Sequence, residues 1–211
     1  MRWKISNKQE DYYASIKFME TEVQNISDKK LENLIWILEY PPLYTAGLSA
    51  KPIDLLNKNK FPIFNSNRGG KYTYHGPGQR VIYTLINLNN DKDIGKFVSN
   101  LENIIIGTLS DFGIKGQRND NHHGIFVKKN DNQNYKIASI GCRFKNWISY
   151  HGFSINHNPT LEHYSGINPC GLNNKNVTSI EDLGKKISKE ELNVAIKENI
   201  LRMFKIWSVQ L

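Results

Sequence analysis

The nine residues from Arg80 to Leu88 (RVIYTLINL) constrain the fold of this chain more than any other segment. They are apolar almost throughout, which is typical of a central strand that is covered on both faces. Such a strand requires a sheet around it and other elements packed against that sheet. The chain has 211 residues, of which 39% are hydrophobic, so it can supply this core, and we expect residues 1–211 to form a single domain.

Helix and strand patterns interleave along the rest of the sequence. Apolar periodicity predicts helices over Asp11–Asn25 and Ile94–Phe112, and the capping box Ser188–Glu191 predicts the start of a third. Because strands and helices do not alternate strictly, we predict an α+β fold with a mixed, mostly antiparallel sheet packed with helices. Further strands are predicted over Leu34–Glu39, Ile63–Asn65, Lys71–Tyr74, Gly124–Val127, Lys136–Phe144 and Trp147–Asn156, the last two joined by a hairpin turn at Lys145-Asn146.

The net charge of +8 and the pI near 9.3 favour an acidic partner: nucleic acid, an anionic membrane surface or an acidic protein. The lysines are scattered among asparagines, so a dedicated nucleic-acid tail is not expected and a solvated basic surface is the alternative. No apolar stretch has the length of a transmembrane helix, and the first residues lack the pattern of a signal peptide. We therefore expect a cytoplasmic protein.

The segment from Arg68 to Gln79 (RGGKYTYHGPGQ) is dense in residues suited to a ligand site. The Gly69-Gly70 pair allows positive φ and a close approach of the backbone to a ligand. His75 precedes a second tight turn, Gly76-Pro77-Gly78. The alternative is two ordinary hairpin turns with His75 as an exposed turn residue. The glycine spacing does not fit a phosphate-binding loop or a dinucleotide fingerprint.

Lys136 opens the strand-like segment KIASIG (136–141). Strict alternation would place Lys136, Ala138 and Ile140 on one face of the strand. A lysine at this position is either an edge cation whose ammonium reaches water, or a partly desolvated ammonium that tunes a neighbouring acid.

Only two cysteines occur, so a disulfide scaffold is excluded. Cys170, between a proline and a glycine, is predicted to lie in a turn where a thiol can be exposed. Cys142 lies inside a strand pattern, which favours a role in the core. A nucleophilic Cys170 needs a cation nearby, because a free thiol is mostly protonated at neutral pH. The candidates are Lys136, His75 and His151.

Four motifs together resemble the octanoyltransferases of lipoate biosynthesis, also called lipoyl(octanoyl) transferases. The motifs RGGKYTYHGPGQ, KIASIG, YHGFSINHNP and INPCG occur in that family's order and spacing. The segments EYPPLYTAG (39–47) and VTSI (177–180) support them, so that the resemblance runs from about residue 34 to residue 184.

The resemblance implies the catalytic module shared by biotin- and lipoate-protein ligases. It also implies that an octanoyl group passes from octanoyl-acyl carrier protein to a lysine of a lipoyl domain, as found in 2-oxoacid dehydrogenases and the glycine cleavage H protein. Exchange of one thioester for another is nearly level in energy and amide formation runs downhill, so no nucleotide or other cofactor is expected. Both protein partners are typically acidic, which would give the basic charge a role in their encounter.

By match to the motifs, Cys170 would be the thioester nucleophile, and Lys136 would lower its pKa and act as acid and base. The family's acyl-substrate site would be lined by Arg68, Gly69, Gly70, Lys71, Tyr72, Thr73, Tyr74, His75, Ser139, Ile140, Gly141, Gly152, Phe153 and Ser154.

The chain departs from the family at His122-His123-Gly124, where Ala-Pro-Gly is common, and at Cys142, which is a small or aliphatic residue elsewhere. The two adjacent histidines lack the spacing of metal ligands, so no metal site is expected. Two other functions stay open at this point. A lipoate- or biotin-protein ligase would depend strictly on ATP and would not need Cys170. A nucleic-acid-binding module would show steep salt dependence and form no acyl adduct.

Overall fold

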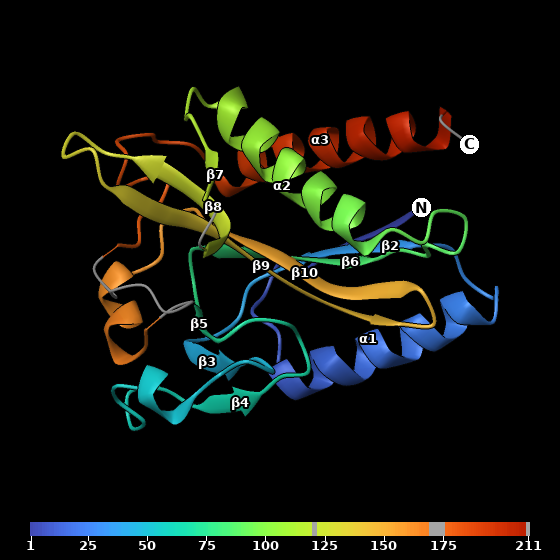
Figure 1. Ribbon diagram of the computed structural model, residues 1–211, viewed down its shortest axis with the longest axis horizontal. Coiled ribbons are helices and arrows are strands. Elements are labelled where there is room, and N and C mark those ends of the chain that lie inside the picture. The colour runs from blue at the N-terminus through green and yellow to red at the C-terminus, as the bar shows by residue number, and fades with distance from the viewer. Residues whose placement is uncertain (120–121, 169–175, 210–211) are drawn as a thin grey trace.

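The computed structural model describes residues 1–119, 122–168 and 176–209. It contains a seven-stranded sheet of order β1-β2-β6-β10-β9-β8-β7 and a three-stranded sheet of order β4-β3-β5. In Figure 1, α2 and α3 lie over one side of the large sheet, and α1 and the small sheet lie on the other side. No helix in these three ranges is long and apolar enough to cross a membrane.

The pairing is mixed and mostly antiparallel, as the sequence predicts. Only the pairs β1–β2 and β3–β4 are parallel among the strands that the structure describes. The large sheet contains β1 (Arg2–Ile5), β2 (Leu34–Leu38), β6 (Gln79–Leu85), β7 (Gln117–Asn119), β8 (His122–Lys128), β9 (Asn134–Lys145) and β10 (Ile148–Asn156), and the small sheet contains β3 (Leu43–Ala46), β4 (Ile63–Asn65) and β5 (Tyr72–His75).

Strand β6 lies inside the large sheet, between β2 and β10, and is covered on both faces, as its apolar sequence predicts. All seven of its residues are buried. Ile82 joins the core cluster beneath α2 and α3, whereas Val81, Tyr83 and Leu85 pack in the cluster beneath α1. Hydrophobic burial on both faces therefore favours an interior position for this strand in the sheet.

The helices begin where side chains can cap them. The Asp11 carboxylate accepts a hydrogen bond from the Ala14 N–H (2.8 Å), and Asp93 accepts one from Lys96 (2.8 Å). Ser188 and Glu191 form the predicted capping box, with reciprocal bonds of 2.7 and 3.1 Å. The helices are α1 (Tyr12–Ser27), α2 (Ile94–Asp111) and α3 (Lys189–Val209), with short 3₁₀ turns η1 (Pro52–Asp54) and η2 (Leu161–Gly166).

Two local features of β9 differ from the sequence prediction. Its register with β8 shifts so that Ile137 is an extra residue, and Ile137 and Ala138 both face the core. The alternation predicted from Lys136 onward is therefore wrong, because a β-bulge interrupts the two-residue period. The turn into β10 lies at Asn146-Trp147, one residue later than predicted. Both turn residues have positive φ (51° and 61°), as a tight two-residue hairpin requires.

Candidate active site

A cavity of about 520 Å³ lies between the Arg68–Lys71 turn, the strands β9 and β10, and helix α2. Its size is in the usual range for a small-ligand pocket. Every predicted acyl-site residue lines it except Tyr74. Tyr74 points the other way, and its hydroxyl lies 2.8 Å from His163 Nδ1. The two neighbours of Tyr74 on β5 line the cavity because side chains alternate along a strand.

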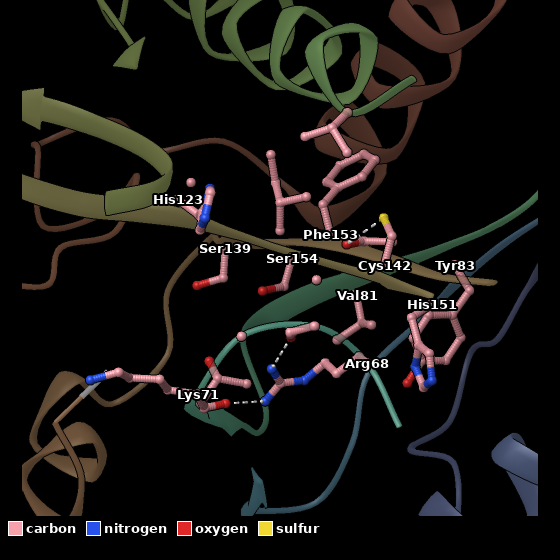
Figure 2. A pocket seen from close by; sticks show the side chains of 18 of the residues that line it. Arg68, Lys71, Val81, Tyr83, His123, Ser139, Cys142, His151, Phe153 and Ser154 are labelled. Atoms are coloured by element: carbon pink, nitrogen blue, oxygen red, sulfur yellow. Dashed lines mark hydrogen bonds between the residues drawn. The ribbon is translucent and has the colours of Figure 1, made fainter. Parts of the chain in front are cut away.

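After Ala138, β9 no longer pairs with β8, and its backbone contacts the Arg68–Lys71 turn instead. The Gly69 N–H donates to the Cys142 carbonyl oxygen (3.0 Å). A Cβ atom on Gly141 would lie 3.0 Å from the Gly69 oxygen, so the two backbones approach each other closely because both residues are glycine. Figure 2 shows Ser139 and Ser154 pointing toward the turn that carries Arg68 and Lys71, and Phe153 pointing to the opposite side of the strands.

The Arg68 guanidinium stabilises this turn by hydrogen bonds to backbone carbonyl oxygens. Its Nη2 atom donates to the carbonyl oxygens of Thr45 and Lys71, both at 2.9 Å, and Nη1 donates to the Gly69 oxygen at 2.9 Å. These bonds hold the backbone of the turn against β3 of the small sheet. They also place a fixed positive charge beside the cavity.

Two buried histidines line the cavity near Arg68. His75 is 7% exposed, so the exposed-turn alternative is wrong for it. Burial, followed by the charge of Arg68, lowers the pKa of His75 to about 4. Burial also lowers the pKa of His151 to about 3, with Arg68 as the next cause. His151 has a φ of 61°, an uncommon conformation for a side-chain-bearing residue. Both imidazoles are neutral at pH 7.

Lys136 lies behind one end of the cavity. It is 3% exposed, so its ammonium does not reach water as an edge cation would. Its Nζ atom donates to the His123 carbonyl oxygen (2.8 Å) and lies 5.8 Å from the centre of the Phe126 ring. Next to His123, Gly124 has a φ of 113°, and a Cβ atom there would lie 2.8 Å from Lys136 Cε. The backbone of His123 and Gly124, which line the cavity, therefore forms a thin layer between the Lys136 ammonium and the cavity.

Cys170 lies outside the described residues. The residues that flank its segment are both held by backbone bonds. The Asn168 N–H donates to the Asp54 oxygen (2.8 Å), and the Lys136 N–H donates to the Asn176 oxygen (2.9 Å). Lys136 also forms a parallel bridge with Val177.

The other thiol, Cys142, lines the cavity and packs against the core beneath α2. Burial raises its pKa to about 12. The thiolate is the reactive form of cysteine, so Cys142 is a poor nucleophile at neutral pH.

Several residues of the cavity wall were missed by the sequence analysis. They belong to helices and strands that come together only in the folded chain. In the sequence, each has the pattern of an ordinary core or helix-surface position. The Arg118 guanidinium fixes one of them, Glu102, through a 2.6 Å ion pair. The missed residues include Tyr12, Val81, Tyr83, Ile94, Val98 and Glu102.

Comparison with known proteins identifies the family of this chain. Residues 11–201 match the family model of the Lipoyl protein ligase A/B catalytic domain, and the chain belongs to that family. Within it, the chain is 46% identical over 204 residues to an octanoyltransferase of Wolbachia pipientis subsp. Culex pipiens, covering 96% of this chain and 98% of the relative. It is 41% identical over 205 residues to an octanoyltransferase of Rhodospirillum rubrum, covering 97% and 95%. The chain is thus a member of the octanoyltransferases.

Solved structures confirm the predicted fold. A chain from the bi-partite lipoate protein ligase system of Thermoplasma acidophilum superposes with a TM-score of 0.74 at 11% identity, covering 97% of this chain and 84% of that one. Lipoate-protein ligase A bound with ATP gives 0.71 at 13% identity, covering 97% and 86%. The biotin protein ligase of Aquifex aeolicus gives 0.55 at 12% identity, covering 97% and 69%.

Proposed function

We propose that this chain transfers an octanoyl group from octanoyl-acyl carrier protein, through a thioester on Cys170, to the Nζ atom of a lysine in a lipoyl domain. The acceptors are the lipoyl domains of 2-oxoacid dehydrogenases and the glycine cleavage H protein. Membership in the octanoyltransferases supports the reaction type. The position of Lys136 is the observation that carries the mechanism.

The reaction takes two steps. In the first, the Cys170 thiolate attacks the carbonyl carbon of the donor thioester, a carbon–sulfur bond to Cys170 forms, and the bond to the carrier sulfur breaks. The carrier leaves as a thiol after taking up a proton. In the second, the neutral amine of the acceptor lysine attacks the enzyme thioester, loses a proton and forms an amide. The Cys170 thiolate leaves, ready for another donor.

Lys136 is suited to both steps. A buried ammonium would stabilise the Cys170 thiolate, give a proton to the departing carrier thiolate and then, as an amine, take one from the attacking lysine. The 2.8 Å bond to the His123 oxygen fixes the ammonium directly behind Gly124 at the end of the cavity. The backbone bond from Lys136 to Asn176 links the same residue to the segment that contains Cys170.

The cavity is suited to the acyl chain. Gly69, Gly70, Gly141 and Gly152 give walls without side chains, and Phe153 adds an apolar surface. Burial of each methylene contributes about 0.8 kcal/mol, so an eight-carbon chain gains several kcal/mol over a two-carbon one. The cavity can therefore favour octanoyl over short acyl groups.

A transfer assay tests this proposal. We incubate the purified chain with octanoyl-acyl carrier protein and an unmodified lipoyl domain in the absence of ATP. The mass of the lipoyl domain is then measured by mass spectrometry. We expect one octanoyl group on its lysine. Modification that requires ATP and free octanoate would contradict the proposal and identify a ligase reaction instead.

A further inference from the structure

We propose that the exposed side of residues 48–60, called here the 48–60 surface, is where the acidic carrier protein docks when it delivers the octanoyl group. This inference rests on the proposed function and adds the surface that recognises the donor.

The 48–60 surface combines exposed apolar and basic side chains. Leu48, Ile53 and Leu56 are 72%, 78% and 52% exposed, although large apolar side chains are normally buried. Lys51 and Lys58 are exposed beside them. The only carboxylate within the segment, Asp54, is buried and paired with Lys71 at 3.3 Å. The exposed charge of the segment is therefore positive.

The backbone of the segment connects the cavity to the residues that precede Cys170. At one end, the N–H groups of Leu48 and Ser49 donate to the Arg68 and Gly70 oxygens, both at 3.0 Å, and Ser49 lines the cavity. At the other end, the Leu56 N–H donates to the Gly166 oxygen (2.9 Å). In Figure 1, η1 lies beside the small sheet, below η2. A protein bound on this surface would hold its thioester arm next to the cavity.

The charge of the surface suits an acidic donor protein, and the arm of the donor adds a second anionic group. The acyl group of a carrier protein is attached through a phosphodiester-containing arm, and its anionic phosphate would meet Lys71, which lines the cavity. The acceptor carries no such phosphate, so this contact with Lys71 is available to the donor arm alone. An acidic protein face with an apolar centre complements the lysines and the Leu48, Ile53 and Leu56 side chains.

The test compares a protein-bound donor with a small neutral one. The double variant Lys51→Glu/Lys58→Glu and the single variant Ile53→Ser are mixed with octanoyl-acyl carrier protein or with octanoyl-N-acetylcysteamine. Formation of the acyl-enzyme is followed by quenched-flow mass spectrometry. The double variant Lys17→Glu/Lys186→Glu, which changes the net charge by the same amount, and Val194→Ser on α3 are matched controls, since all three residues are exposed and distant in sequence.

We expect kcat/KM for the carrier protein to fall about tenfold or more in both 48–60 variants, and its salt dependence to be lost in the charge-reversal variant, while the controls stay at the wild-type value. The rate with the small thioester should stay unchanged, which also shows that the variants are folded. Unchanged rates with the carrier protein, equal losses with both donors, or a loss confined to kcat/KM for the lipoyl domain would overturn the docking proposal. The proposal would also be overturned if the 48–60 variants lost binding to anionic phospholipid vesicles while their kinetics with the carrier protein stayed unchanged. Failure of the wild-type chain to form an adduct with either donor would instead contradict the proposed function itself.

Discussion

The Nδ1 atom of His75 lies 2.7 Å from Oε1 of Gln79, and this contact fixes the tautomer of the histidine. The Gln79 Nε2 atom donates to the Tyr74 carbonyl oxygen (3.2 Å), so the Oε1 atom faces His75. An amide oxygen can only accept, and His75 Nδ1 must therefore carry the proton. Because burial keeps the ring neutral, Nε2 is left as the nitrogen that can accept a hydrogen bond.

Replacement of His75 by alanine should slow the reaction without preventing it. The change removes the Nε2 acceptor from the cavity wall but leaves Cys170 and Lys136 in place. We expect a lower rate constant or a higher KM for the donor, with the acyl adduct still formed. Steady-state kinetics with varied carrier protein measure this effect. Wild-type kinetics in the variant would mean that His75 has no role in donor binding.

The two buried histidines should make the protein lose stability in mild acid. The pKa values of about 4 for His75 and about 3 for His151 lie below the ordinary value of 6.5. Between pH 6.5 and 4 the unfolded chain therefore binds more protons than the folded one, and stability falls as the pH falls. The expected loss from pH 7 to pH 5 is about 2 kcal/mol for each histidine.

Urea unfolding at pH 7 and pH 5 measures this loss. The glutamine in His75→Gln cannot titrate. The difference in the free energy of unfolding between pH 7 and pH 5 should therefore be smaller in this variant by the contribution of one histidine. An equal difference in the variant and the wild-type chain would contradict the shifted pKa of His75.

Substitution of Lys136 should raise the pKa of the Cys170 thiol and lower transfer by orders of magnitude. Lys136→Met retains the apolar stem and removes the ammonium that would stabilise the thiolate. The alkylation rate is measured against pH in a Cys142→Ser background, where Cys170 is the remaining thiol. The midpoint should move to higher pH in the variant. An unchanged midpoint would remove the ion-pair role, whatever happens to turnover.

Gly124→Ala should impair acylation by displacing the Lys136 side chain. The new Cβ atom would overlap the Ala138 carbonyl oxygen and lie 2.8 Å from Lys136 Cε, in addition to the strain of a φ of 113°. Gly184→Ala is the control, because Gly184 also has a positive φ (77°) but nothing lies within 4 Å of its Cβ position. Both variants should lose stability by about 1 kcal/mol or more from backbone strain, Gly124→Ala more than Gly184→Ala because its Cβ atom also overlaps the Ala138 backbone, and only Gly124→Ala should lose acylation rate. Equal rates in the two would contradict the placement of the ammonium.

Much of the fold could be predicted because its signals are local. The apolar run that forms β6, the periodicity of α2 and the capping box at Ser188 each depend on residues that are close in the sequence. The strand β3 was missed because it follows Pro41-Pro42 and completes its pairing only with β4 and β5. The bulge at Ile137 leaves no mark in the sequence, since it depends on the register with β8.

The cavity could be predicted only in part. The motif residues of the Arg68–His75 segment and of β9 and β10 line one cavity except Tyr74, which strand alternation turns away from it. Val98 and Glu102 belong to a helix with no motif, and Tyr12 is the first residue of α1. Their meeting depends on how the helices pack, which no local pattern encodes.

The central claim is that Cys170 carries the octanoyl group, and the most direct test is the mass of the protein after mixing with octanoyl-acyl carrier protein in the absence of acceptor. We predict the addition of one octanoyl group, mapped to Cys170, sensitive to hydroxylamine and discharged by a lipoyl domain without ATP. Cys142→Ser should still form the adduct, because burial keeps that thiol protonated. An adduct on Cys142, or full turnover in Cys170→Ser, would contradict the mechanism.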